Sequence, residues 1–290
     1  MKKLAIIAGI LVTIIGVFLY FHDNQNNKIK ESIIFFPIDS SVTFTSASTT
    51  LKLLEEEDED EYSIRWKVNS TIGKDAYLRQ DISLLFEDGR LKETSSRWTE
   101  DTDKIEQEKT MMSEDSGHFE AISFHHAELH YPNDVIKSAQ TMSYDQLYVI
   151  DTPLQPLESF KTPETVEDKD NKKILDHATD QQLKMVWDSL INYYNIPTDE
   201  YFMIPFTQLV MYTNHSLPGL SKEKTDKVVG GLWEGIYKNY FLGVKYEGHI
   251  ESPIGSTMPL LLFHKNMSHL IFLSKTASGK EVQFIQFIDP

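Results

Sequence analysis

The pattern of apolar and polar positions changes along the chain and divides it into parts. An uninterrupted apolar run extends from Leu4 to Phe21, and its only polar side chains are Thr13 and Tyr20. Residues 32–151 show short alternations, which are typical of strands with one polar face. Residues 176–290 combine helical and strand patterns. The sequence therefore predicts an α+β fold, with an N-terminal transmembrane helix, a mostly antiparallel β-rich region and a C-terminal α+β region.

The apolar run 4–21 is predicted to cross a membrane. As a helix it would be about 27 Å long, near the lower limit for a hydrocarbon core of ~30 Å. It is longer than the apolar part of a cleaved signal peptide and ends in bulky residues, although a cleaved export signal is the alternative. Lys2 and Lys3 precede it, so the positive-inside rule puts the N-terminus in the cytosol and the chain after about residue 22 outside. Residues 1–22 are thus expected to form a cytosolic tip and signal anchor, followed by a polar tether at 23–31.

The strand pattern of the β-rich region is clearest at Tyr62–Val68, where apolar residues alternate with Ser63, Arg65 and Lys67. Asp88-Gly89 lies between two alternating runs and predicts a two-residue hairpin turn. Further strands are expected at 119–131 and 147–150. Together these signals predict an antiparallel meander with one face against a core and the other in water.

A charged, proline-containing stretch at 152–175 is expected to link the two exported regions. Beyond it, Thr179 and Gln182 have the spacing of a capping box, which predicts that a helix begins there. Apolar residues then recur at helical spacing until Pro197 ends the run.

A second helix is expected after Ser221, which is a suitable N-cap residue. Trp187 and Trp233 lie on the apolar stripes of the two helices and are predicted to belong to the core. The last strand, residues 282–288, is apolar on both faces and is therefore expected to be central and buried.

Composition limits the cellular compartment and the binding partners that can be expected for this protein. The chain is 40% hydrophobic, so the exported part has enough apolar side chains for a core. It has no cysteine, which excludes disulfides, thiol nucleophiles and cysteine-ligated zinc, and which suits a bacterial cell envelope. The net charge of −16 disfavours binding to nucleic acid. The expected partners are the membrane, through the N-terminal helix, and another envelope protein.

The most suggestive chemistry lies in the segment His118–His130, which also contains His125. On a strand, His126, Glu128 and His130 share one face. Neighbours about 7 Å apart on that face can bind one metal, whereas a straight row of three spans about 13 Å. These three residues are candidate ligands for zinc or another divalent ion, because only imidazole and carboxylate groups are available. The alternative is a polar strand face with ordinary histidines.

Two other motifs have simpler explanations. The acidic run 55–61 could gather calcium, but it lacks the glycine and alternating spacing of an EF-hand loop, so a solvated loop between strands is expected. Asp115-Ser116-Gly117 matches the triplet of aspartic proteases, but Glu114 precedes it and no second such triplet follows. A turn is expected there instead.

The sequence has no G-x-S-x-G, P-loop or G-x-G-x-x-G motif. We therefore expect a non-enzymatic, single-pass membrane-anchored protein outside the cytosol, acting as a binding, sensing or regulatory module of the bacterial cell envelope. The sequence assigns it no catalytic residue and no cofactor. The alternative is a metal-dependent or carbohydrate-active envelope enzyme that uses the His118–His130 cluster. That alternative requires the cluster to converge in one pocket.

Overall fold

The computed structural model describes residues 36–54, 61–152, 155–246 and 249–288. The predicted anchor and tether, and the acidic run apart from Glu61, lie outside the described residues. What is described belongs to one compact unit, Ile33–Pro290. Within the described ranges, no helix combines the length and apolarity that a membrane crossing requires.

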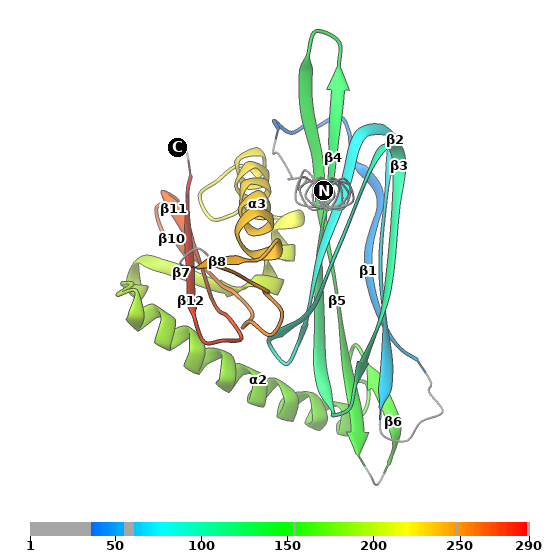
Figure 1. Cartoon of the computed structure of the whole chain (residues 1–290), viewed down its shortest axis with the longest axis vertical. Coiled ribbons are helices and arrows are strands. Elements are labelled where there is room, and N and C mark those ends of the chain that lie inside the picture. The colour runs from blue at the N-terminus through cyan, green and yellow to red at the C-terminus, as the bar shows by residue number, and fades with distance from the viewer. Residues whose placement is uncertain (1–35, 55–60, 153–154, 247–248, 289–290) are drawn as a thin grey trace, which may run out of the picture. The chain divides into compact units, whose positions relative to one another are not determined.

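The first sheet is antiparallel and has six strands, which agrees with the predicted β-rich region (Figure 1). Its strands are β1 (Phe44–Leu54), β2 (Tyr62–Glu87), β3 (Arg90–Ser113), β4 (Gly117–Tyr131), β5 (Val135–Thr152) and β6 (Gln155–Phe160). The spatial order is β1-β2-β4-β5-β6, with β3 paired to β2. The first half of β2 pairs with β1 and its second half with β4, while β3 pairs along both halves.

The predicted hairpin turn at Asp88-Gly89 joins β2 to β3. Asp88 and Gly89 have φ angles of 47° and 73°, and positive values at both central residues are what a type I′ turn requires. The turn is packed closely, since a Cβ added at Gly89 would lie 2.8 Å from the side chain of Leu183. It is also bonded to a distant part of the chain: Met258 N donates to Gly89 O at 2.6 Å, and Leu91 N donates to Ser256 O at 2.8 Å.

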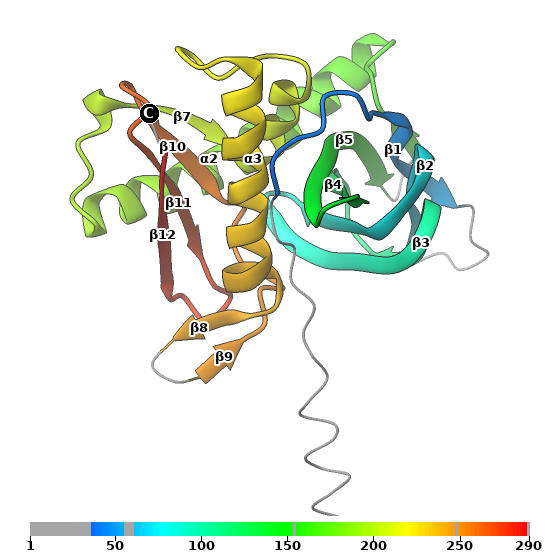
Figure 2. The ribbon, with the colours of Figure 1, turned by 90° about the horizontal axis from the view of Figure 1, so that it is seen from above.

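Strands β1 to β5 curl round an interior of their own, as Figure 2 shows from above, and we call them the rolled sheet. Residues of β1 lie against β5, where Leu51 N donates to Asp145 Oδ2 at 2.7 Å. The period-2 alternation of β2 sends Asp81 and Ser83 into the roll and Leu84 and Phe86 to its outer face. In the first half of β2, Arg65 and Lys67 stay at the surface, as the alternation predicted. In the second half, the polar face with Asp81 and Ser83 is buried in the roll instead, because curvature brings strands of one sheet over it.

The second sheet is also antiparallel and has the order β12-β11-β10-β7. Its strands are β7 (Tyr201–Pro205), β10 (Leu260–His264), β11 (His269–Lys275) and β12 (Glu281–Phe287). The remaining elements are α2 (Val166–Tyr193), η1 (Thr198–Glu200), η2 (Phe206–Thr213), α3 (Lys222–Ile236), η3 (Tyr237–Phe241), β8 (Val244–Tyr246) and β9 (His249–Glu251). Helix α2 packs on one face of the second sheet, where Leu190 and Ile191 meet Leu262 and Ile271.

Helix α3 lies between the two sheets, and the main apolar core surrounds it (Figure 2). Trp233 is fully buried there, stacked on Phe124 of the rolled sheet at 5.2 Å between ring centres and edge-on to Phe206. Its Nε1 donates to the Met142 sulfur at 3.4 Å. The prediction that Trp233 is a core residue is confirmed. Trp187 on α2 is only half-buried, and its Nε1 donates to Met258 O at 2.9 Å.

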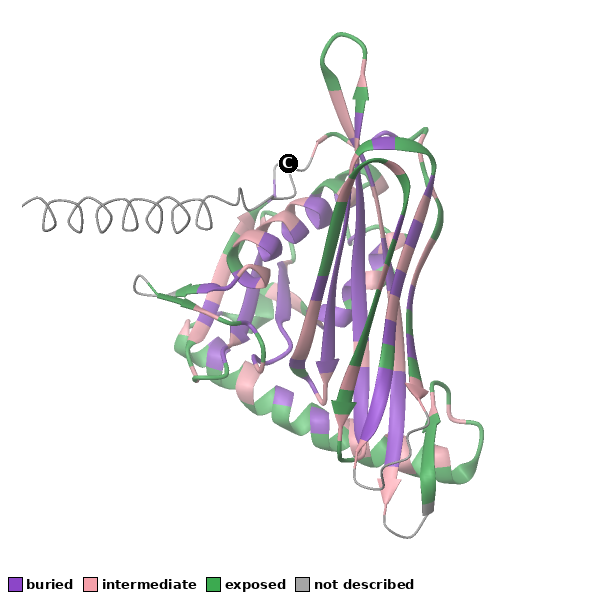
Figure 3. Cartoon of the chain, turned by 45° about the vertical axis from the view of Figure 1, so that its right-hand side comes forward, coloured by how far each residue is buried: buried purple, intermediate pink, exposed green. Residues whose placement is uncertain are grey.

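Helix α2 begins earlier than the sequence predicted. Thr165 is its N-cap and forms a capping box with Asp168, whereas Thr179 is a buried residue inside the helix. The stretch 152–175, predicted to be a linker, therefore contains β6 and the first turns of α2. These turns carry few buried residues, as the exposed surface of α2 in Figure 3 shows, so they have no apolar stripe for a sequence pattern to detect.

The prediction that the last strand is central and buried is wrong. β12 is an edge strand, and Ile285 and Phe287 on it are 47% and 79% exposed. Its other face is covered because Val282 and Phe284 pack into the core around α3. An edge strand with apolar residues on both faces has the same sequence pattern as a central one.

Candidate functional site

The structure brings together two of the three predicted metal ligands. Glu128 Oε1 and His130 Nε2 lie 2.5 Å apart near the surface, where His130 stacks on Tyr77. His126 is buried instead, with its Nε2 3.1 Å from Ser138 Oγ. Burial lowers the pKa of His126 to about 4. Within the described parts of the chain, no group of three or more His, Asp or Glu residues is arranged to hold a metal.

The other histidines of the predicted cluster lie in two further environments. His125 points into the roll, and His118 lies on the outer face near the opposite end of β4. The cluster is continuous in sequence but divided in space, because neighbouring residues of a strand point to opposite faces and the strand is long. The convergence that the enzyme hypothesis required of this segment is not found among these residues.

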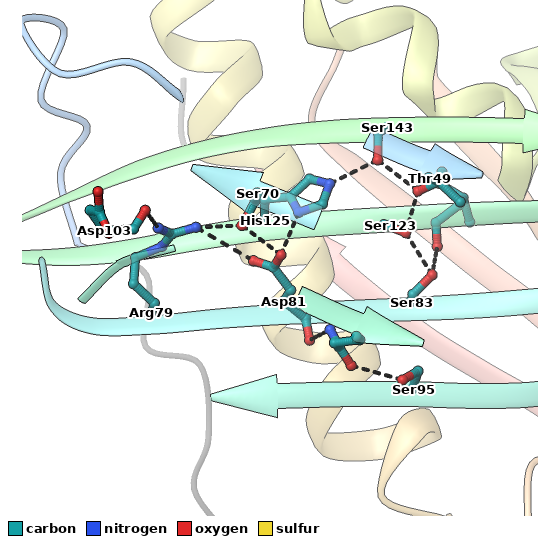
Figure 4. A network of polar contacts seen from close by, with 12 residues as sticks. Thr49, Ser70, Arg79, Asp81, Ser83, Ser95, Asp103, Ser123, His125 and Ser143 are labelled. Carbon is teal, nitrogen blue, oxygen red and sulfur yellow. Dashed lines mark hydrogen bonds and ion pairs between the residues drawn. The ribbon is translucent and has the colours of Figure 1, made fainter. Parts of the chain in front are cut away.

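A buried polar layer crosses the interior of the rolled sheet, and Figure 4 shows its contacts. His125 Nδ1 lies 2.8 Å from Asp81 Oδ2, and His125 Nε2 lies 2.8 Å from Ser143 Oγ. Ser143 Oγ is in turn 2.6 Å from Thr49 Oγ1. Ser83 and Ser123 continue this layer, with their hydroxyl oxygens 2.6 Å apart.

Arg79 is the cation of this layer and is fully buried. Its guanidinium donates to the Asp103 carbonyl at 2.6 Å and to the Ser70 hydroxyl, and Nη2 lies 3.8 Å from Asp81 Oδ1. The ring of Phe44 covers the guanidinium at 4.9 Å. Burial lowers the pKa of Arg79, although the arginine remains the cation of the pair at any pH that proteins tolerate.

The chain Asp81–His125–Ser143 has the connectivity of a hydrolase triad, but its surroundings are those of a structural layer. Asp81 and His125 are 0% exposed, and Ser143 lies within strand β5. None of the three lines the cavities described below. Along β4 the layer separates two apolar clusters, one at Phe119 and the other at Leu129.

A cavity of about 400 Å³ lies outside the roll, between β4, β5, α2 and η2. Apolar side chains form part of its wall, among them Leu183, Val210 and Met258. Polar and titratable side chains also line it, among them His118, Glu120, Tyr144, Tyr148, Lys172 and Asp176. Concave sites with an apolar wall and a few convergent polar groups are typical of small-molecule binding sites.

Two hydroxyl groups fix the carboxylate of Glu120 in the cavity wall. Tyr144 and Thr207 each donate to its Oε1 at 2.9 Å. Burial raises the pKa of Tyr144, so its hydroxyl keeps its proton and remains a donor. The second carboxylate oxygen of Glu120 has no hydrogen-bond partner in the described part of the protein.

A second polar group links β5 to α2 on the opposite wall. The Tyr148 hydroxyl donates to Asp176 Oδ1 at 2.8 Å, and Lys172 Nζ lies 2.6 Å from Asp176 Oδ2. His118 stacks on Tyr148 with 4.0 Å between ring centres, and its Nδ1 is 3.7 Å from Asp176 Oδ1. Burial lowers the pKa of His118 and so favours its neutral form.

The sequence indicated only part of this site. His118 was in the predicted cluster, and a period of two from it leads to Glu120 on the same face of β4. Tyr144 and Tyr148 follow the same alternation on β5, which was a signal available in the sequence. Lys172 was missed because it lies in the stretch taken for a linker, and Asp176 because it precedes the predicted start of the helix at Thr179. Their spacing of four residues is nevertheless that of one helix face.

Asp115 and Ser116 lie in the connection between β3 and β4, where the chain bends at Asp115, and Gly117 is the first residue of β4. Ser116 Oγ donates to the Asp151 carbonyl at 2.8 Å and thereby ties this bend to the end of β5. Asp115 and Ser116 also line an open hollow of about 640 Å³ at this end of the rolled sheet. Its acidic lining includes Glu87, which pairs with Lys92 at 2.6 Å.

Comparison with known proteins identifies no relative of this chain. No protein-family model matches the sequence, no curated protein matches it, and no solved structure matches the fold.

Proposed function

We propose that this chain is a small-molecule-binding module held at the outer face of a bacterial cell membrane, and that its ligand site is the cavity between β4, β5, α2 and η2. One observation carries the binding part of this proposal. Polar groups from four separate elements converge on one cavity that also has an apolar wall. The apolar run 4–21 with its preceding lysines supports the anchored, extracytoplasmic location.

Binding is favoured over catalysis because the titratable side chains of the cavity are hydrogen-bonded to one another. The Tyr148 hydroxyl and Lys172 are both bound to Asp176, and the Tyr144 hydroxyl is bound to Glu120. Burial raises the pKa of both tyrosines, which makes them poor nucleophiles and poor bases at neutral pH but good hydrogen-bond donors. Such groups fix the position of a ligand rather than transfer protons.

Thermal unfolding of the full-length protein in a neutral detergent tests the binding proposal. The panel consists of sugars, amino sugars, amino acids, polyamines and fatty acids. A ligand at a hundred times its Kd stabilises the folded protein by about 2.7 kcal/mol, so at least one class should raise the unfolding midpoint.

A matched pair of variants shows where such a ligand binds. Gln208 is exposed and lines the cavity, so Gln208→Trp fills it without disturbing the core. Gln181 is exposed on α2 but does not line the cavity, so Gln181→Trp is the control. The midpoint rise should disappear in the first variant and persist in the second. A panel without effect, or a rise that survives Gln208→Trp, contradicts the proposed site.

The location is tested separately by mass spectrometry of the protein extracted from membranes. The N-terminal peptide containing Lys2 and Lys3 should be present. A mature chain beginning between about residues 20 and 30 would show that the apolar run is a cleaved export signal.

A further inference from the structure

We infer that the ligand of this cavity carries a positively charged nitrogen joined to a short apolar group. This inference rests on the proposed function, since it names the ligand class of the same site. It follows from the balance of donors and acceptors in the cavity wall, from the charges there and from the apolar residues beside them.

The acceptors in the wall outnumber the donors that are free to reach a ligand. Gln146 Nε2 donates to the Lys161 carbonyl at 3.1 Å, which leaves its Oε1 to face His118 Nε2 at 3.4 Å. When a neutral His118 donates from Nε2 to this oxygen, its Nδ1 carries no proton and is an acceptor. Nδ1 faces Asp176 Oδ1 at 3.7 Å, so two acceptors point at each other across a gap. A ligand with several N–H donors satisfies both.

The charges lead to the same conclusion. Lys172 is the one cation in the described lining, and Asp176 already neutralises it at 2.6 Å. Glu120 and Asp180 then remain as two further carboxylates in the wall. Asp180 is exposed and has no ion-pair partner among the residues that the structure describes. An anionic ligand would meet these charges without a free cation to bind it, whereas an ammonium group is attracted by both.

The apolar side of the cavity limits the rest of the ligand. Leu183, Val210 and Met258 line it, and none of them offers a side-chain group that makes a strong hydrogen bond. A short hydrocarbon portion buried against these residues gains free energy in proportion to its area. A bare metal ion or a fully polar cation would leave this wall in contact with water.

Three probes of equal length separate charge from apolar contact: n-butylammonium, n-butanol and n-butyrate. Each is titrated by calorimetry into the full-length protein in a neutral detergent at low salt. We expect one-to-one binding of butylammonium, binding of butanol at least about tenfold weaker, and no binding of butyrate. A hydrogen bond to a charged group is commonly strong enough for such a factor.

Glu120→Gln removes the charge but keeps an oxygen that accepts from Tyr144 and Thr207, and it should weaken butylammonium binding about tenfold. Glu158→Gln is the control, because Glu158 is exposed on β6 and does not line the cavity. Asp180→Asn gives a second charge removal at an exposed position if Glu120→Gln lowers the unfolding midpoint. Butylammonium binding that neither variant weakens would overturn the inference.

The probes also separate this inference from the proposed function. Binding of butanol or butyrate as tight as that of butylammonium, and abolished by Gln208→Trp, would leave a binding cavity but refute its preference for cations. If no probe binds, or if Gln208→Trp leaves binding unchanged, the cavity is not the ligand site and both proposals fail.

Discussion

The protein has two interiors that share the strands of one sheet. On the outer face of the rolled sheet, Leu84 and Phe86 join an apolar core around Trp233. On the inner face, the alternating residues Arg79, Asp81 and Ser83 lie in the polar layer and are just as fully buried. The difference shows that the alternation of apolar and polar residues distinguishes the two faces of a strand but does not determine which face is exposed to water. Here curvature buries the polar face, and its charges must therefore be matched within the protein.

The two interiors are also specified in different ways. The apolar core depends on shape and volume, and tolerates changes that preserve both. The polar layer depends on pairing, since a buried charge without its partner costs several kcal/mol. Substitutions in the two interiors should therefore differ in which replacements are tolerated.

Trp233→Ala should have the largest effect, because it removes a fully buried ring that stacks on Phe124 and contacts Phe206. We expect the free energy of unfolding to fall by about 5 kcal/mol. Chemical denaturation measures it, with Trp98→Ala as control, because Trp98 is 41% exposed on β3. A loss no larger than that of the control would contradict the position of α3 between the sheets.

Arg79→Met replaces the guanidinium with an uncharged, unbranched side chain that still fills most of the space. It leaves Asp81 buried without its cation. The expected loss in unfolding free energy is about 4 kcal/mol. Arg65→Met is the matched control, since Arg65 pairs with Glu108 at 3.2 Å on the exposed face and should cost less than about 1 kcal/mol. Equal losses in the two variants would mean that the polar layer does not depend on charge pairing.

His126 makes the stability depend on pH. Its pKa is about 4 in the folded protein, below the ordinary 6.5, so the unfolded chain binds the proton more readily between these values. Stability is therefore full above about pH 6.5 and is lost as the pH falls towards 4, by roughly 3 kcal/mol. His126→Phe should reduce this pH dependence, because it removes the imidazole that takes up the proton. Ser138 Oγ keeps a hydrogen-bond partner in this variant, since it still accepts from Phe36 N at 3.1 Å. An unchanged difference in unfolding free energy between pH 7 and pH 4 would refute the assignment.

Ser83→Ala should have a smaller effect still, about 1 kcal/mol, because Ser123 keeps a hydrogen bond to Thr49 at 2.5 Å. Its neighbour Leu84 faces the other interior, and Leu84→Ala should cost about 2–5 kcal/mol. Thermal or chemical unfolding of both variants compares the two faces at adjacent positions. The comparison fails if Ser83→Ala proves the more damaging.

Local signals in the sequence predicted local structure well. The turn at Asp88-Gly89 and the N-cap Ser221 were found because each depends on residues next to it in the chain. The edge position of β12 and the burial of the polar face in the second half of β2 were not predictable, because both depend on what packs against a strand from elsewhere. The site was found only in part for the same reason: its residues come from four elements, and the spacing within one element cannot show which elements meet.

The hydrogen bonds from the Asp88-Gly89 hairpin to residues 255–258 have a consequence for how the chain matures. The hairpin end of β2 and β3 can form all of its hydrogen bonds only after a segment more than a hundred and sixty residues later has been synthesised. Contacts so distant in sequence slow folding. A nascent chain that has been made only through β6 therefore carries an uncovered apolar sheet face. During synthesis this intermediate is therefore the species most exposed to aggregation and proteases, until α3 and β10 emerge.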